Sequence, residues 1–286
     1  MTPAPTEPAR IEQPPTGRAG RNLPAAIGVG VLLAGVVVVS LFARKEAFVG
    51  VVAVAAVLGV RELTTAFGTR GIKVPFIPLS GGAVGMVLAA YVSAEEGLVL
   101  AFALTAFALV LWRIVDGVSG AVQDVVASVF SAAYVPLLAG FACLMLAQRD
   151  GPQRILVTIG VVAASDVGGY TAGVLFGKHP MAPTISPKKS WEGFAGSTTA
   201  CLAVGAGLVV WLLSGPWWAG LAVGAACVVS ATLGDLSESL IKRDLGIKDM
   251  GDLLPGHGGL MDRLDSLLPS APVAYLLLAL FVPVVR

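Results

Sequence analysis

The chain has 286 residues, of which 56% are hydrophobic and only 13% are charged, and its mean hydropathy is +0.85. Soluble domains carry about a quarter charged residues, so this composition excludes an ordinary soluble protein and indicates an integral membrane protein. The formal net charge of +1 gives no sign of a nucleic-acid partner.

Residues 1–23 are rich in Pro, Thr, Glu and Arg, and this composition predicts a disordered tail. The tail does not resemble a signal peptide, so we expect the first helix to remain as an anchor. Apolar runs of about 20 residues, the length that spans a bilayer, then recur along the chain. They predict an all-α polytopic membrane protein with about nine transmembrane helices. The runs cover approximately 25–43, 47–67, 75–93, 97–115, 125–147, 155–176, 193–213, 217–236 and 266–284.

The distribution of basic residues predicts the orientation, because cytoplasmic loops carry an excess of Lys and Arg. With a cytoplasmic N-terminus, 14 of the 19 Lys and Arg residues fall on the cytoplasmic side. We therefore expect a multi-pass protein of the plasma membrane whose polar segments face the cytoplasm. Polar residues concentrate late in the chain, which predicts an N-terminal transmembrane bundle over 24–154 and a catalytic one over 155–286.

The most polar stretch runs from Asp235 to Asp265 and contains seven acidic residues, four basic residues and His257. Such charge cannot lie in hydrocarbon, where each ionised side chain at mid-depth costs roughly 2.5–3.5 kcal/mol. Asp235, Ser239 and Lys242 follow i, i+4, i+7 spacing and share one helical face. This face suits a metal ion and a phosphate, although a solvated helix end with ordinary ion pairs has the same pattern.

The loop around His257 contains several glycines, which let a ligand approach the backbone closely. His257 is a candidate metal ligand, proton donor or phosphate contact, with a plain surface histidine as the alternative. Asp262 and Asp265 then follow at i, i+3 spacing with Arg263 between them. Two carboxylates near Asp235 predict a hard oxygen site for Mg²⁺. A simple helix cap is the alternative role for Asp262.

Asp166 lies within an apolar run, where an ionisable group is a functional hypothesis by default. The alternative is a buried Asp with a structural partner. The following loop carries basic and hydroxyl side chains that suit a polyphosphate or an anionic lipid headgroup. An ordinary positive-inside loop would have a similar composition. The candidate residues in it are Ser186, Lys188, Lys189, Ser190 and Glu192.

Residues 239–265 resemble the signature of the phosphatidate cytidylyltransferase (CDP-diacylglycerol synthase) family. Upstream, the stretches at 234–239 (GDLSES) and 186–193 (SPKKSWEG) also resemble that family, and the similarity extends over about 160–284. Ser190 stands where the family commonly has Thr, which keeps the hydroxyl. The matching elements are Ser239, Lys242-Arg243, Lys248-Asp249, Gly251, Leu254-Pro255, His257-Gly258-Gly259, Asp262-Arg263 and Asp265.

The resemblance implies transfer of cytidylyl from CTP to phosphatidic acid, giving CDP-diacylglycerol and pyrophosphate, with Mg²⁺ required. It places the metal at Asp235 and Asp262, and we add Asp265 as a third candidate ligand. The family is also described with a second, potassium-like cation, and it forms homodimers. Lys242, Arg243, Lys248 and Arg263 would hold phosphates. The remaining predicted contacts to substrates are Asp166, Ser186, Lys188, Lys189, Ser190, Glu192, Ser239, Asp249, Gly258 and Gly259, and His257 completes the catalytic set.

Two other functions fit parts of the pattern. A CTP-dependent lipid kinase of the polyprenol or dolichol type would release CDP, whereas a cytidylyltransferase releases pyrophosphate. A secondary transporter could use Asp166 and Arg113 on an ion path. Transporters usually show matching broken helices in both halves, whereas the polar residues here crowd one half of the chain.

Overall fold

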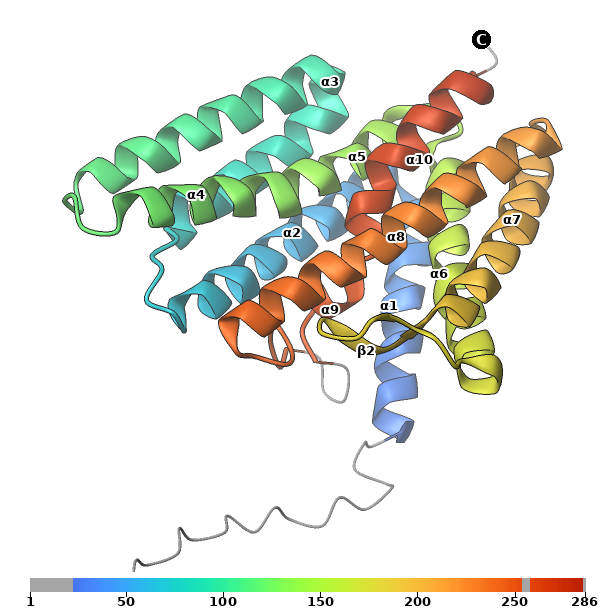
Figure 1. Ribbon diagram of the computed structural model, residues 1–286. Helices are drawn as coiled ribbons and strands as arrows, with labels where there is room; N and C mark the ends of the chain where they lie inside the picture. The colour runs from blue at the N-terminus through green and yellow to red at the C-terminus, as the bar shows by residue number, and fades with distance from the viewer. Residues whose placement is uncertain (1–22, 254–257, 285–286) are drawn as a thin grey trace, which may run out of the picture.

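The computed structural model describes residues 23–253 and 258–284, and this part of the chain is mainly helical (Figure 1). Except for Leu23, the predicted disordered tail lies outside the described residues, as does His257. The elements are α1 (Leu23–Ala43), α2 (Lys45–Gly68), α3 (Phe76–Ile114), α4 (Ala121–Ala132), η1 (Ala133–Leu137), α5 (Leu138–Ala147), α6 (Gly151–Phe176), β1 (Pro180–Ala182), β2 (Ser186–Ser190), α7 (Trp191–Leu213), α8 (Trp217–Leu245), α9 (Met261–Leu264) and α10 (Leu267–Phe281).

The helices confirm an all-α polytopic membrane protein. Within the described ranges, seven helical segments are long and apolar enough to cross a membrane. The described apolar part of α1, Gly30–Ala43, is shorter and is not among them. The seven segments are Lys45–Gly68, Phe76–Ile114, Ala121–Ala147, Gly151–Phe176, Trp191–Leu213, Trp217–Leu245 and Met261–Phe281.

Helix α3 is a folded-back pair of helical halves rather than one straight rod. A straight helix of its 39 residues would be about 58 Å long, roughly twice the hydrocarbon thickness. The helical dihedrals are interrupted at Ser93 and Ala94, and Ala94 has φ 53°. A Cβ on Gly82 would lie 2.2 Å from the side chain of Thr105, so the two halves lie against each other. Figure 1 shows this hairpin, whose halves match the predicted runs 75–93 and 97–115.

The next span, Ala121–Ala147, contains a local defect at Pro136. Proline has no backbone N–H and cannot continue the regular helical hydrogen-bond ladder. The chain accommodates it with the π-helical turn η1 and then resumes α-helical geometry in α5. At the start of the same span, Asp124 accepts hydrogen bonds from Arg113 Nε (2.8 Å) and from the Lys73 backbone N–H (2.8 Å). Arg113 is thus part of a buried ion pair that joins α3 to α4.

Small residues let α6, α7 and α8 pack closely, as the glycine-rich composition suggests. A Cβ on Gly168 of α6 would lie 2.7 Å from the Gly196 carbonyl oxygen of α7. Between α7 and α8, a Cβ on Gly205 would lie 2.5 Å from the Gly220 carbonyl oxygen. Helix α8 continues to Leu245, beyond the end of the apolar run at 236, so Asp235, Ser239 and Lys242 lie on one helix as expected.

The predicted loop between α6 and α7 contains a small antiparallel hairpin, β1–β2. The expectation of a purely helical chain did not include it. A hairpin this short is marginal by itself and depends on its neighbours. At its end, Ser190 caps α7 by accepting a hydrogen bond from the Gly193 backbone N–H (3.1 Å).

Helices of the two predicted bundles contact each other. Helix α10 packs against α5 as well as against α8 and α6, and α2 contacts α9. In Figure 1, α10 lies between the α5 and α8 ribbons. The signature region is therefore surrounded by helices from both halves of the chain.

Candidate active site

A polar cleft of about 560 Å³ lies between α6, the β1–β2 hairpin with the start of α7, α8 and α9. Its volume falls within the range of roughly 300–1,000 Å³ typical of small-molecule sites. Segments far apart in the sequence meet here, as the fold brings the end of α8 against the hairpin and α9. Eleven of the predicted site residues line it: Asp166, Ser186, Lys188, Lys189, Ser190, Asp235, Lys242, Asp249, Asp262, Arg263 and Asp265.

An ion pair joins the hairpin to α8 across this cleft. Lys189 Nζ lies 2.5 Å from Asp235 Oδ2, and both side chains are partly exposed, at 25% and 33%. One turn further along α8, Ser239 Oγ donates to Asp235 Oδ1 at 3.3 Å. The predicted shared face of α8 is thus present, and its Asp235 contacts the basic hairpin through Lys189.

A second, more buried ion pair joins α8 to α9. Lys242 Nζ lies 2.6 Å from Asp262 Oδ1, and the Asp262 side chain is only 8% exposed. Asp262 Oδ2 accepts hydrogen bonds from the backbone N–H groups of Gly259 (2.9 Å) and Met250 (3.0 Å). Glu238, which is fully buried, lies 3.4 Å from the same ammonium group. The Asp262 carboxylate is therefore held from two sides of the signature loop.

The donor chemistry of the cleft suits a hard divalent cation. Asp166, Asp235, Asp262 and Asp265 line one cavity, and two of these carboxylates already lie against ammonium groups. Within residues 23–253 and 258–284, no three His, Cys, Asp or Glu side chains form a ready-made metal cluster. Mg²⁺ does not require one, because it usually takes one or two carboxylates together with substrate phosphates and water. The residues therefore fit Mg²⁺ bound jointly with a phosphate ligand.

Two of the predicted substrate contacts, Glu192 and Arg243, are not among the residues that line the cleft. Glu192 Oε1 lies 2.5 Å from His179 Nδ1, and its Oε2 accepts from the Lys178 and His179 backbone N–H groups. Arg243 Nε donates to the Ile185 carbonyl oxygen at 3.4 Å. In this structure Glu192 joins the segment before β1 to α7, and Arg243 joins the turn between β1 and β2 to α8.

The remaining predicted residues lie around the signature loop. Lys248 is exposed, and Gly258 has φ 80°, a backbone conformation that favours glycine. A Cβ on Gly258 would also lie 3.2 Å from Asp262 Oδ2. Gly259 contributes the backbone N–H bound to Asp262. His257 lies outside the described residues.

The sequence interpretation missed several polar residues of the cleft. Thr232, Tyr170, Ser165 and Ser266 all line it. Helical spacing could have indicated two of them, because Thr232 precedes Asp235 by one turn and Tyr170 follows Asp166 by one turn. Their side chains carry no charge, so they do not stand out within apolar runs.

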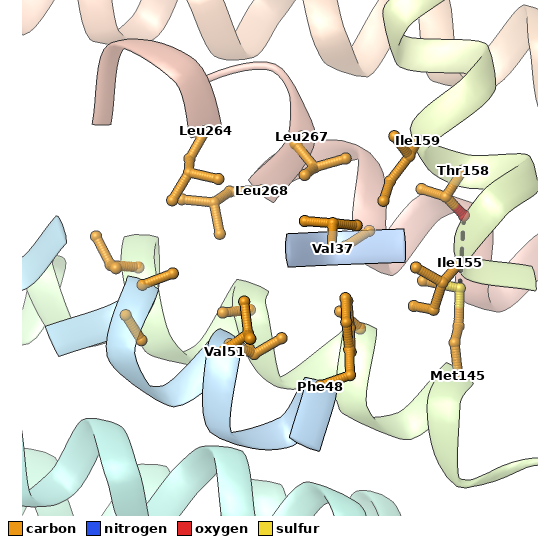
Figure 2. Close-up of a pocket in the computed structure, with 17 residues that line it drawn as sticks. Val37, Phe48, Val51, Met145, Ile155, Thr158, Ile159, Leu264, Leu267 and Leu268 are labelled. Carbon is orange, nitrogen blue, oxygen red and sulfur yellow. Dashed lines mark hydrogen bonds between the residues drawn. The ribbon is translucent and has the colours of Figure 1, made fainter. Parts of the chain in front are cut away.

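A separate apolar cavity of about 130 Å³ lies on another side of α9 and α10 (Figure 2). Leu264, Leu267 and Leu268 point into it, facing side chains from α1, α2, α5 and α6. Its lining is almost purely apolar; Thr158 donates its hydroxyl to its own helix and to Met145 Sδ. A cavity of this kind offers nothing to bind a phosphate, so we assign the chemistry to the polar cleft.

A cleft lined by lysines and carboxylates in a polytopic helical bundle is suited to phosphate-bearing ligands at a membrane. The comparison with known families agrees. Residues 24–281 match the cytidylyltransferase family, and the chain belongs to that family. It is 45% identical over 282 residues to the phosphatidate cytidylyltransferase of Mycobacterium leprae (strain TN), covering 93% of this chain and 90% of that relative. It is 42% identical over 278 residues to the Mycobacterium bovis (strain ATCC BAA-935 / AF2122/97) protein of the same name, covering 93% and 91%.

A more distant relative matches a shorter region. The phosphatidate cytidylyltransferase of Synechocystis sp. (strain ATCC 27184 / PCC 6803 / Kazusa) is 41% identical over 140 residues, which cover 47% of each chain.

Proposed function

We propose that this protein transfers cytidylyl from CTP to phosphatidic acid, forming CDP-diacylglycerol and pyrophosphate for phospholipid synthesis. The observation that carries the proposal is the pair of lysine–aspartate contacts, Lys189–Asp235 and Lys242–Asp262, in one cleft. Basic groups suited to phosphates lie there beside carboxylates suited to a cation. The family and the names of the relatives support the same reaction.

In the proposed reaction, a phosphate oxygen of phosphatidic acid attacks the α-phosphorus of CTP in line with the departing pyrophosphate. A new P–O bond forms as the α–β phosphoanhydride bond breaks, and pyrophosphate carries away the bond electrons. Such a transfer depends mainly on positioning and on neutralising charge. The attacking phosphate is already ionised near neutral pH, so the chain need not supply a general base.

The basic residues of the cleft would hold the phosphates of both substrates. Lys188, Lys189, Lys242 and Arg263 line the cavity, and the signature also supplies Arg243 and Lys248, which are both exposed. Lys189 and Lys242 now contact carboxylates, and each ammonium group could also bind a phosphate oxygen because it has three donors. Asp235 and Asp262, with Asp265 nearby, would hold Mg²⁺, which supplies charge neutralisation at the phosphates when bound. The family's potassium-like second cation is part of the same proposal.

We propose the finer topology on the same grounds. Counting α1 and the two halves of α3 separately gives the nine spans expected from the apolar runs. The charge bias supports a cytoplasmic N-terminus and a cleft that faces the cytoplasm, where CTP is available. Bacterial relatives support the plasma membrane, and the family resemblance supports a homodimer.

Product analysis tests the reaction. Purified protein in lipid vesicles should convert CTP and phosphatidic acid into a CDP-lipid with one pyrophosphate released per lipid. EDTA should stop the reaction, and added Mg²⁺ should restore it. Release of CDP with a phosphorylated lipid product would instead identify a CTP-dependent lipid kinase and overturn the proposal.

A further inference from the structure

Helix α2, far from the signature in sequence, brings a buried carboxylate directly to it. Glu62 is only 5% exposed. Its Oε1 accepts a hydrogen bond from the Leu260 backbone N–H at 2.9 Å, and its Oε2 accepts one from the Met261 N–H at 2.8 Å. Hydrogen bonds to an ionised acceptor are roughly twice as strong as neutral ones. One side chain of the N-terminal half thus holds two consecutive amides of the signature loop.

Glycines of the signature make this approach possible. A Cβ on Gly251 would lie 2.7 Å from Glu62 Oε1, and a Cβ on Gly259 would lie 2.7 Å from Glu62 Oε2. One turn earlier on α2, a Cβ on Gly59 would lie 3.0 Å from Met261 Sδ. The Glu62 carboxylate therefore lies between the backbone at 251 and the backbone at 259. Side chains at these two positions would occupy the space that the carboxylate needs.

The amides held by Glu62 immediately precede Asp262. That aspartate accepts from the Gly259 and Met250 backbone N–H groups and pairs with Lys242. The loop is consequently held by two carboxylates. Glu62 binds the N–H groups of Leu260 and Met261, and Asp262 binds those of Gly259 and Met250. Functional groups must be held to within about 0.5 Å of their productive geometry, so the support of residues 259–261 bears directly on the Asp262 carboxylate.

A second contact from the end of α2 reaches the other side of the site. Arg70 Nη2 donates to the Asp244 carbonyl oxygen at 2.5 Å, and its Nε donates to the Leu245 carbonyl oxygen at 3.3 Å. These carbonyls end α8, the helix that carries Lys242. Helix α2 and its following turn therefore contact both segments that form the Lys242–Asp262 pair.

We propose that Glu62 is a positioning residue of the active site, which fixes residues 259–261 and thereby orients Asp262. The catalytic part of this inference rests on the proposed function, whereas the structural part stands on the two hydrogen bonds. On this account helix α2, which belongs to the predicted N-terminal bundle, supplies part of the catalytic framework.

Glu62→Gln tests the proposal with two readouts on the protein in lipid vesicles. Glutamine keeps the shape but has a single acceptor oxygen, so one of the two amides loses its partner. Hydrogen exchange in a peptide covering 258–266 should accelerate by roughly tenfold or more, the cost of one charge-assisted hydrogen bond. The rate constant kcat should fall by a similar factor, while KM for CTP changes less.

Asp124→Asn is the matched control, because Asp124 is equally buried at 5% and also accepts a backbone N–H, from Lys73. It should lower the melting temperature but leave exchange in 258–266 and kcat unchanged. If Glu62→Gln does not fold, Glu62→Asp carries the test, since it keeps the charge and both acceptor oxygens. Relative to the wild type, its exchange in 258–266 should be faster and its kcat lower, each by less than about tenfold.

The outcomes separate the two proposals. If the wild type makes CDP-lipid and the Glu62 variant matches it in exchange and kcat, positioning by Glu62 is wrong. It is equally wrong if Asp124→Asn reproduces both changes. If the wild type makes no CDP-lipid, the proposed function fails, and accelerated exchange alone then decides whether Glu62 holds the loop.

Discussion

The segment formed by α9 and the start of α10 separates two cavities of opposite character. One face contributes Asp262 and Asp265 to the polar cleft, and another contributes Leu264 and Leu268 to the apolar cavity in Figure 2. Helical periodicity makes this possible, because residues three or four apart share a face. We therefore expect the chemistry to depend on charge in the polar cleft, while packing in the apolar cavity supports the same segment.

The largest effect is expected from removing the paired carboxylates of the cleft. Asp235→Asn and Asp262→Asn should each lower kcat by roughly 100- to 1,000-fold, as expected for losing a preorganised electrostatic contact. CDP-lipid formation in vesicles measures the effect. Asp116→Asn, at an exposed acid in the turn after α3, is the control and should retain wild-type activity. Full activity in both cleft variants would rule out these carboxylates as catalytic groups.

The apolar cavity should respond in stability instead of chemistry. Leu268 is 5% exposed, and Leu268→Ala should lower the free energy of unfolding by about 2–5 kcal/mol. Thermal denaturation in detergent measures this loss, and kcat well below the melting temperature should stay close to the wild-type value. Leu280→Ala, on the same helix but 62% exposed, provides the comparison and should change stability far less. A selective loss of kcat in Leu268→Ala would break the division between the two cavities.

A smaller effect on activity is expected at the hairpin. Lys189→Ala removes the contact to Asp235 and should lower kcat/KM for CTP by roughly 10- to 100-fold, the value of one hydrogen bond to a charged group. Titrations of CTP in the vesicle assay measure it. Lys188→Ala removes a neighbouring cleft lysine for which no carboxylate contact is described, so its loss should be smaller. Equal losses at both positions would show that the Lys189–Asp235 pair has no special role.

Local patterns predicted much of this protein. Apolar length predicted the long apolar helices, and one-turn spacing correctly placed Asp235, Ser239 and Lys242 on one side of α8. The family resemblance predicted that the hairpin residues and the signature belong to one site, and both line the same cleft. These features depend on composition, periodicity or short motifs, all of which are visible along a single stretch of chain.

Contacts between distant segments could not be predicted in the same way. Glu62 lies near the end of the predicted run 47–67, and nothing in that run indicates its partners, which are backbone amides almost 200 residues away in the chain. The hairpin escaped notice because its five-residue second strand contains Pro187 and two lysines, which are poor strand formers. The pairing of Lys189 with Asp235 depends on how the hairpin and α8 lie relative to each other in space.

The most direct test of the central claim follows the phosphorus atoms of CTP. The protein in vesicles is given phosphatidic acid and CTP labelled at either the α-phosphate or the γ-phosphate. Cytidylyl transfer predicts that the α label enters the lipid and the γ label leaves as pyrophosphate, and that Asp262→Asn loses both signals together. Entry of the γ label into lipid would contradict the account and assign the cleft to a lipid kinase.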